Sequence, residues 1–235
     1  MGQQNTSISV FFPCYNEEGN VERVVRRAVE VCEELGADFE IIIVDDGSAD
    51  GTGRIADALA AADSRVRVVH HCPNLGYGAA LQSGIRAATK QLVFFTDGDG
   101  QFDTGEITLL LPLIEQNDIV CGYRLDRSDP IVRKLNGWLW TRLVNLLFGM
   151  HIRDIDCAFK LFRREVFADM RMSSGGALIS AEILARATRR GCRIAQVGVH
   201  HYPRTAGKQT GAKLRVILRA FKELFALYNR IRRGE

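Results

Sequence analysis

Apolar and polar positions follow two different periods along the first 120 residues. Short runs of β-branched and aromatic residues predict strands at 8–12, 40–44, 66–69, 92–96 and 118–121. The segments between them place apolar residues at helical spacing and predict helices at 18–35, 50–62, 77–89 and 105–114. Strands that alternate with helices at this spacing form βαβ units, so the pattern predicts an α/β, Rossmann-like fold with a mostly parallel sheet flanked by helices.

The second half of the chain has a less regular pattern. It predicts helices at 131–150, 179–190 and 213–233, an extended segment at 154–162 and a strand at 193–199. The last of these helices is basic and amphipathic. Because no repeat and no low-complexity linker divides the 235 residues, we expect a single domain, 1–235, made of two halves, 1–120 and 121–235.

The net charge of +3 hides a division between these halves. Residues 1–120 carry 8 basic and 19 acidic side chains, a net charge of −11, whereas residues 121–235 carry 23 basic and 9 acidic ones, a net charge of +14. This division indicates that the second half meets phosphates or anionic lipid. The alternative is that it reflects only solvated faces of different sign.

The cysteines and the apolar runs bear on location. Six dispersed cysteines without a C-x-x-C pair are typical of reduced thiols in a cytoplasmic protein, and they argue against a disulfide framework or a zinc site. No signal peptide opens the chain, and no run of 18 uncharged apolar residues is long enough to span a bilayer. We therefore expect a cytoplasmic location.

Acidic loops follow three of the predicted strands. In parallel sheets ligands bind beyond the carboxyl ends of the strands, so these loops are expected to converge on one site. Asp97-Gly98-Asp99 places two carboxylates one residue apart, which suits one hard divalent cation, Mg²⁺ or Mn²⁺, that clamps a diphosphate. The alternative is a turn in which Asp and Gly serve only the loop conformation.

The loops after the first two strands predict a nucleoside site. Asp45 or Asp46 can accept a hydrogen bond from a nucleobase N–H or a ribose hydroxyl. Alternatively, Ser48 or Asp50 caps the next helix without any ligand. The stretch 13–17 adds the aromatic face of Tyr15 and an acid near a helix start.

Together these loops resemble those of the inverting family-two glycosyltransferases with the GT-A fold, and in particular the dolichol-phosphate mannose synthase branch. Residues 13–17 correspond to the family's P-x-Y-N-E, 45–48 to its D-D-x-S, and 97–101 to its D-x-D-x-Q. Four stretches of the second half are similar to further family motifs: 122–124, 133–134, 153–160 and 204–208. The likeness extends over most of the chain.

The resemblance implies roles for individual residues. The implied metal ligands are Asp97, Asp99 and Gln101. The implied nucleotide-sugar contacts are Pro13, Tyr15, Glu17, Asp45, Asp46, Asp97, Gly98 and Asp99. The implied phosphate and acceptor contacts are Arg124, Arg133, Arg204, Lys208 and Lys213. The family's Ser near Lys208 is replaced here by Gln-Thr, which leaves open whether Lys208 or Lys213 contacts phosphate.

The implied reaction is inverting sugar transfer from GDP-mannose or a UDP-hexose to a polyprenyl or dolichyl phosphate. The implied catalytic residues are Asp97, Asp99, Asp156 and Arg204. An acceptor that is already a phosphate anion needs no strong base, whereas Asp156 or Glu182 would be the base for a hydroxyl acceptor. The rival interpretations are a soluble or polysaccharide hydroxyl acceptor and a non-catalytic nucleotide-sugar-binding protein.

Two stretches predict contact with a membrane surface. Residues 131–150 contain Trp138, Leu139 and Trp140 among basic residues, and 214–233 place an apolar stripe opposite a basic face. The alternative is that both helices pack on the core or form a dimer seam. The expected partners are a nucleotide sugar, a lipid phosphate and a membrane surface, with a membrane protein or a second copy also considered and no nucleic acid.

Overall fold

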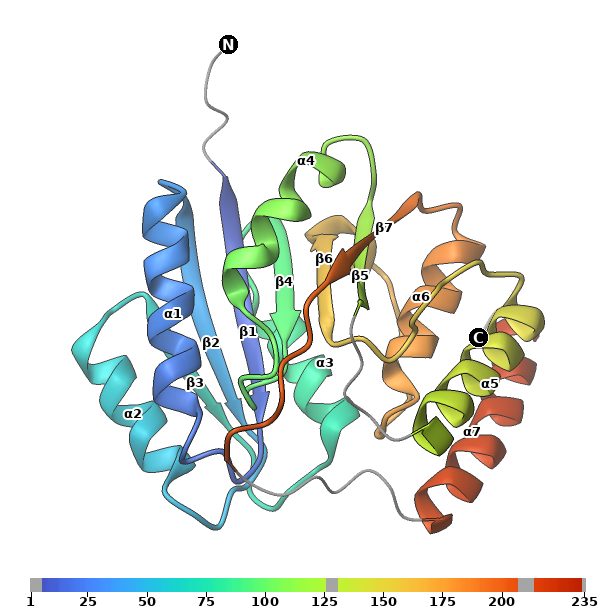
Figure 1. Ribbon diagram of the computed structural model, residues 1–235, viewed down its shortest axis with the longest axis horizontal. Helices are drawn as coiled ribbons and strands as arrows, with labels where there is room; N and C mark the ends of the chain where they lie inside the picture. The colour runs from blue at the N-terminus through green and yellow to red at the C-terminus, as the bar shows by residue number, and fades with distance from the viewer. Residues whose placement is uncertain (1–5, 126–130, 207–213, 234–235) are drawn as a thin grey trace.

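The computed structural model describes residues 6–125, 131–206 and 214–233. Within them, seven strands form one sheet in the order β3-β2-β1-β4-β6-β5-β7 (Figure 1). The strands are β1 (Ser7–Cys14), β2 (Asp38–Asp45), β3 (Val66–His70), β4 (Leu92–Thr96), β5 (Ile119–Arg124), β6 (Phe159–Arg163) and β7 (Ile194–Val199). β6 runs antiparallel to both of its neighbours, and every other pairing is parallel. The predicted mostly parallel sheet is therefore confirmed, with strands from both halves of the chain.

Helices cover both faces of this sheet (Figure 1). They are α1 (Val21–Glu34), α2 (Thr52–Ala62), α3 (Tyr77–Ala87), α4 (Leu111–Ile114), α5 (Ile131–Phe148), α6 (Ile179–Arg189) and α7 (Leu214–Arg233), with 3₁₀ turns η1 (Thr104–Leu109) and η2 (Arg164–Phe167). Successive strand residues point to opposite faces, so Phe12 joins the core under α1 and α2 while Phe11 joins the core under α3 and α6. Gly84 lets α3 approach the sheet, because a Cβ there would overlap the Phe11 ring.

Two predicted elements differ from the structure. The helix predicted at 105–114 is divided into η1 and α4, because Pro112 lacks the N–H that a continuous α-helix would need at that position. Of the extended segment predicted at 154–162, only the part from Phe159 is strand. Residues 154–158 form a loop instead, which we call the β6 entry loop.

The direction of the strands brings both halves of the chain to one edge. The parallel strands end at the lower edge in Figure 1, and the antiparallel β6 begins there, so its entry loop lies beside the end of β4. The segment after β7, residues 200–206, crosses under β4 and β1 toward α1 (Figure 1). We call it the crossing segment. The second half therefore adds two segments to the edge at which β1, β2 and β4 end.

Helices α5 and α7 lie side by side at the end of the molecule farthest from α2 (Figure 1). The Phe148 and Tyr228 rings join them, with centroids 5.9 Å apart. Among the side chains of this pair that the structure describes, the large exposed apolar ones are Leu135, Trp138, Leu139, Leu146 and Phe225. Over the described ranges, no helix combines the length and apolar character needed to cross a bilayer.

Candidate active site

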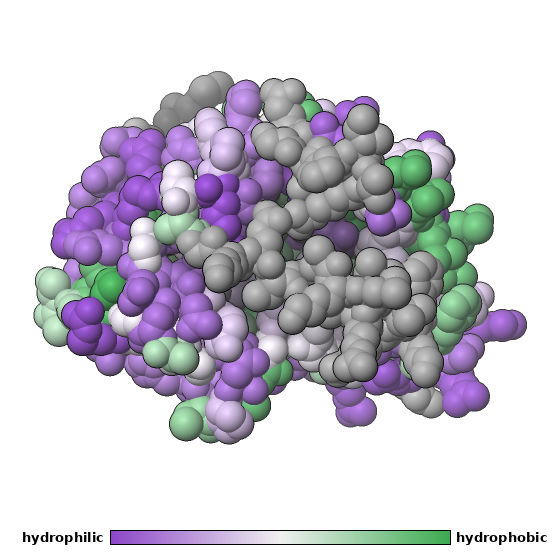
Figure 2. Space-filling model, turned by 60° about the horizontal axis from the view of Figure 1, so that its bottom comes forward, coloured by the Kyte–Doolittle hydropathy of each residue, from purple (hydrophilic) through white to green (hydrophobic). Residues whose placement is uncertain are grey.

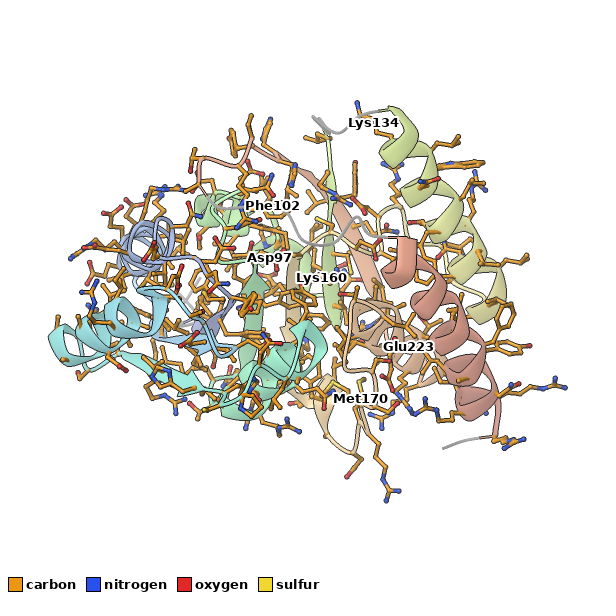
Figure 3. The ribbon with its side chains drawn as sticks, turned by 90° about the horizontal axis from the view of Figure 1, so that it is seen from below. Asp97, Phe102, Lys134, Lys160, Met170 and Glu223 are labelled. Atoms are coloured by element: carbon orange, nitrogen blue, oxygen red, sulfur yellow. The ribbon has the colours of Figure 1, made fainter. Side chains whose placement is uncertain are left out.

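The loop after β4, residues 97–101, forms the centre of the site. Gly98 lies so close to the end of β1 that a Cβ there would overlap Cys14 Sγ. Gly100 has φ +71°, a left-handed conformation that favours glycine. The loop therefore turns sharply while pressed against β1, and it holds Asp97 near the end of the sheet (Figure 3). Asp99 follows two residues later in the same loop.

The charge of Asp99 disfavours the ionised form of Asp97. Burial, and then the charge of Asp99, raise the pKa of Asp97 from its ordinary 3.8 to about 7. The Tyr77 hydroxyl donates a 3.0 Å hydrogen bond to Asp97 Oδ1, which favours the ionised form. A divalent cation placed between the two carboxylates would relieve this repulsion, so the pair fits a hard metal ion.

The protein side of such a metal site is incomplete. No group of three or more His, Cys, Asp and Glu side chains gathers in the part of the chain that the structure describes. The Gln101 amide nitrogen donates to Tyr202 O at 3.0 Å, which leaves its side-chain carbonyl oxygen as the atom able to reach a metal. Two carboxylates and one amide oxygen leave positions for ligand or water oxygens, as expected of a metal that binds a diphosphate.

Asp46, at the end of β2, is saturated by donors from its own protein. Its buried carboxylate accepts hydrogen bonds from His71, Asn74 and the backbone N–H groups of Leu75 and Gly76, at 2.6 to 2.9 Å. All four lone-pair positions are occupied. Asp46 therefore organises the segment that leads into α3.

Asp45 is less fully engaged than Asp46. Its carboxylate accepts from the Ser48 N–H at 3.1 Å and pairs with His70 Nδ1 at 3.2 Å, one contact for each oxygen. Each oxygen keeps acceptor capacity for a further donor. Of the two sequence candidates for base recognition, Asp45 is thus the one able to accept from a nucleoside.

The loop after β1 is hydrogen-bonded to the loop after β2. Asn16, at φ +58°, donates its N–H to Ser48 Oγ, and its side chain accepts from Ala49 N. Thr52 Oγ1 accepts from the Glu17 N–H at 2.8 Å. These contacts hold the two predicted nucleoside loops together and leave Tyr15 45% exposed, with its ring available for stacking.

The crossing segment ties the second half to these loops. Arg204 forms an ion pair with Glu17, and its Nη1 lies 3.6 Å from Asp99 Oδ2. Tyr202 and Gln101 are also joined by a backbone hydrogen bond of 2.8 Å. A guanidinium from the basic half therefore lies among carboxylates of the acidic half, where phosphate oxygens could bind it bidentately.

Arg124 has a different environment. Its guanidinium makes two hydrogen bonds to Asp154, at 2.7 and 2.8 Å, and both side chains are largely buried. Arg124 therefore fixes the β6 entry loop to the end of β5. The side chain of Arg133, on α5, and the residues Lys208 and Lys213 lie outside the described part of the structure.

The two candidate bases, Glu182 and Asp156, have different environments. Glu182 is fully buried, and it accepts from Ser173, Ser174 and Arg186. Because these donors occupy both carboxylate oxygens, Glu182 is not available to take a proton from an acceptor. Asp156 reaches solvent, but the protein crowded around it raises its pKa, and the charge of Asp154 raises it further. Asp156 is therefore the better candidate for a base.

Two residues of the site were not predicted from the sequence. Tyr77 lies on α3, and no spacing rule connects it with Asp97, although Gly76 before it marks the start of that helix. Lys160 is buried near Asp97 in the middle of the sheet (Figure 3). It ends the stretch 153–160, which is similar to a family motif, but a strand lysine is ordinarily expected to reach solvent.

These features define a class of protein: a parallel sheet whose acidic loops can hold a metal and a nucleotide at one edge. The chain belongs to glycosyl transferase family 2, whose sequence profile matches residues 9–171.

Individual relatives agree with this assignment. Glycosyltransferase AglD of Haloferax volcanii is 35% identical over 207 residues, which cover 84% of this chain and 33% of that protein. The chain thus spans about a third of the length of this curated relative.

Solved structures show that the fold is that of GT-A glycosyltransferases. Mannosyl-3-phosphoglycerate synthase from Rubrobacter xylanophilus is similar with a TM-score of 0.75 at 18% identity, over 97% of this chain and 75% of that one. Glucosyl-3-phosphoglycerate synthase from Mycobacterium tuberculosis, in complex with UDP, is similar with a TM-score of 0.70 at 20% identity, over 96% and 81%.

Proposed function

We propose that this chain is an inverting glycosyltransferase of the dolichol-phosphate mannose synthase type. It transfers a sugar from GDP-mannose or a UDP-hexose to a polyprenyl or dolichyl phosphate. The observation that carries the proposal is the position of Arg204, a cation of the basic half that lies between Glu17 and Asp99 of the acidic half. Residues 1–120 would bind the donor and residues 121–235 the acceptor, within a single domain.

The donor would bind across the three acidic loops. Tyr15, Pro13 and Asp45 would contact the nucleoside, while Asp97, Asp99 and Gln101 would hold Mg²⁺ or Mn²⁺. The metal would supply positive charge to the leaving diphosphate. Structures of glucosyl-3-phosphoglycerate synthase that hold Mn²⁺ and UDP support this arrangement.

The chain's own groups would then position the acceptor. Arg204 would hold phosphate oxygens by paired N–H donors, with Lys208 or Lys213 and Arg133 as further cations. An acceptor phosphate oxygen attacks the anomeric carbon, the bond from that carbon to the diphosphate oxygen breaks, and the diphosphate leaves with its electron pair. A single displacement of this kind inverts the anomeric configuration.

The apolar face of α5 supports a lipid acceptor. Trp138 and Leu139 are each about half exposed, and Arg142 lies over the Trp138 ring at 5.2 Å. Figure 2 shows apolar side chains gathered at the end of the molecule where α5 and α7 lie. Aromatic and aliphatic side chains beside cations are typical of helices at an anionic membrane surface. We therefore propose a peripheral location at the cytoplasmic face of the membrane.

Matched acceptors test this function. With Mn²⁺ and a labelled GDP-mannose or UDP-hexose, we expect transfer to a short-chain polyprenyl phosphate and none to the corresponding polyprenol, because only the first is an anion. Equal transfer to both would refute the anionic-acceptor proposal.

Flotation with anionic vesicles tests the membrane contact, and absence of binding at low salt would refute it.

A hydroxyl acceptor is the second candidate, and Asp156 is the observation that favours it. A carboxylate with a raised pKa is a stronger base once ionised, and a hydrogen bond from Trp140 contributes to holding it in place. The structural neighbours named above are a glucosyl-3-phosphoglycerate synthase and a mannosyl-3-phosphoglycerate synthase. Asp156→Asn should leave transfer to a lipid phosphate nearly unchanged, and it should abolish most transfer to a hydroxyl. A loss of several orders of magnitude with the lipid phosphate would refute the proposal that a phosphate acceptor needs no base.

A further inference from the structure

Lys160 is a buried cation in the middle of the sheet. It lies on β6, opposite Phe95 of β4 and Cys121 of β5, and only 1% of its surface is exposed. Its Nζ is 5.6 Å from the centre of the Phe95 ring. A buried ammonium is costly unless it is hydrogen-bonded, so its partners indicate what it does.

Those partners are backbone carbonyls of the β6 entry loop. Nζ donates to Ile155 O at 3.0 Å and also to Cys157 O. Over the described ranges, no carboxylate forms an ion pair with Lys160. The charge is instead compensated at longer range: burial raises the pKa values of Asp97 and Asp156, and the Lys160 ammonium opposes both shifts.

The carbonyls that Lys160 binds flank the functional part of that loop. Asp156 stands between Ile155 and Cys157, and Asp154, which pairs with Arg124, precedes them. On the other side, β4 leads from Phe95 directly into Asp97. One ammonium therefore lies near Asp97 of the loop proposed to hold the metal (Figure 3) and also binds the loop that carries Asp156.

We propose that Lys160 is a positioning residue, which holds the β6 entry loop in register with the Asp97 loop so that acceptor and donor meet. This inference rests on the proposed function, because it takes residues 121–235, which include the entry loop, as the half that binds the acceptor. Lys160 touches neither substrate in this role. Its removal should impair transfer while leaving the binding of donor and metal intact.

Lys160→Met and Arg163→Met form a matched pair for the test. Arg163 is a second cation of β6, and it also donates to backbone carbonyls, those of Ile114 and Asn117, but at the opposite end of the strand. We expect Lys160→Met to bind Mn²⁺ and donor as the unaltered protein does. Its transfer rate should fall on the order of 100-fold, since small displacements of reacting groups have effects of that size. Arg163→Met should transfer at the unaltered rate.

Hydrogen exchange gives a readout that needs no acceptor. The Cys157 N–H donates to Asp154 O within the loop, and it should exchange faster in Lys160→Met than in Arg163→Met. Unchanged exchange together with an unchanged transfer rate would overturn the inference. If the unaltered protein transfers to no acceptor, the proposed function fails, while this exchange still tests the positioning of the loop.

A variant that does not fold also decides the matter. If Lys160→Met does not fold, Lys160→Gln is measured in the same way, because its shorter neutral side chain cannot reach both carbonyls. Full transfer by Lys160→Gln would overturn the inference. Failure of both variants to fold would mean that Lys160 serves the fold alone, and the inference would then be wrong.

Discussion

Two pairs of aspartates lie at strand ends of the same sheet: Asp45 and Asp46 at the end of β2 (the β2 pair), and Asp97 and Asp99 after β4 (the β4 pair). Asp46 and Asp97 have opposite environments. At the end of β2, Asp46 accepts four hydrogen bonds from its own protein. At the end of β4, the Tyr77 hydroxyl is the one hydrogen-bond donor to Asp97 within the described chain. Two short acidic motifs at strand ends therefore have different roles. The donors that face a carboxylate decide whether it builds a loop or stays available to a cation.

Removing a charge from the β4 pair should have the largest effect. Asp97→Asn keeps the size of the side chain but removes one of the two carboxylates that we propose bind the metal. We expect metal-dependent turnover of the donor to fall about 1000-fold, the size of effect seen when a main electrostatic stabiliser of a leaving group is removed. Steady-state kinetics with Mn²⁺ and a manganese titration measure the loss.

Asp103→Asn is the matched control for that change. Asp103 follows the same loop, caps η1 by accepting from Gly105 N, and pairs with Arg27 outside the site. Its variant should retain turnover within a few-fold. Equal losses from both variants would mean that the loop merely tolerates no change of charge, and the metal assignment would then be wrong.

Removing a charge from the β2 pair should instead affect stability. Asp46→Asn places an amide NH₂ against backbone and side-chain donors, so at least two hydrogen bonds to a buried charge are lost. We expect a loss of about 3 kcal/mol in the free energy of unfolding, measured by denaturant titration.

Asp45→Asn completes this comparison. Asp45 makes two protein contacts, one of them to the half-exposed His70, so its variant should lose at most about 1 kcal/mol. Its donor affinity should fall by about tenfold if Asp45 accepts from the nucleoside. A larger destabilisation from Asp45→Asn than from Asp46→Asn would reverse the assignment of the two roles.

The fold could be predicted from the sequence to a large extent, because the first half has clean periodicity. Strand β4 begins and ends where the pattern of 92–96 placed it. The antiparallel direction of β6 could not be predicted, since the direction of a strand depends on long-range pairing and not on its own residues. The break at Pro112 could be predicted from the sequence, because proline lacks the N–H of a continuous helix.

The site could be predicted in part. The positions of Asp97 and Asp99 follow from the rule that ligands bind beyond strand ends. The saturation of Asp46 could not be seen, because its donors include His71 and Asn74, whose side chains point inward only after the loop has folded. Likewise, the pairing of Arg124 with Asp154 depends on how the entry loop turns, and no motif describes that.

The smallest expected effect concerns the pH dependence of the β4 pair. Metal binding requires ionised carboxylates, and the pKa of Asp97 without metal is about 7. Below pH 7 manganese must displace a proton, so its apparent affinity should fall by up to about tenfold per pH unit, with little change above. The stability of the metal-free protein should depend on pH in the opposite direction. Because the folded state binds more protons than the unfolded state between pH 3.8 and about 7, stability should decrease as pH rises through that window.

Tyr77→Phe sharpens this last prediction, because it removes one hydroxyl and little volume. The Tyr77 hydrogen bond favours ionised Asp97, so its loss should raise the pKa of that carboxyl further. Manganese affinity should then fall by about threefold at pH 7 and by about fivefold well below pH 7, as expected for a hydrogen bond worth about 1 kcal/mol. The difference from the unaltered protein should close at about pH 8.5, where Asp97 is ionised in both proteins. A difference that persists undiminished at that pH would show that Tyr77 acts on the geometry of the loop and not on the protonation of Asp97.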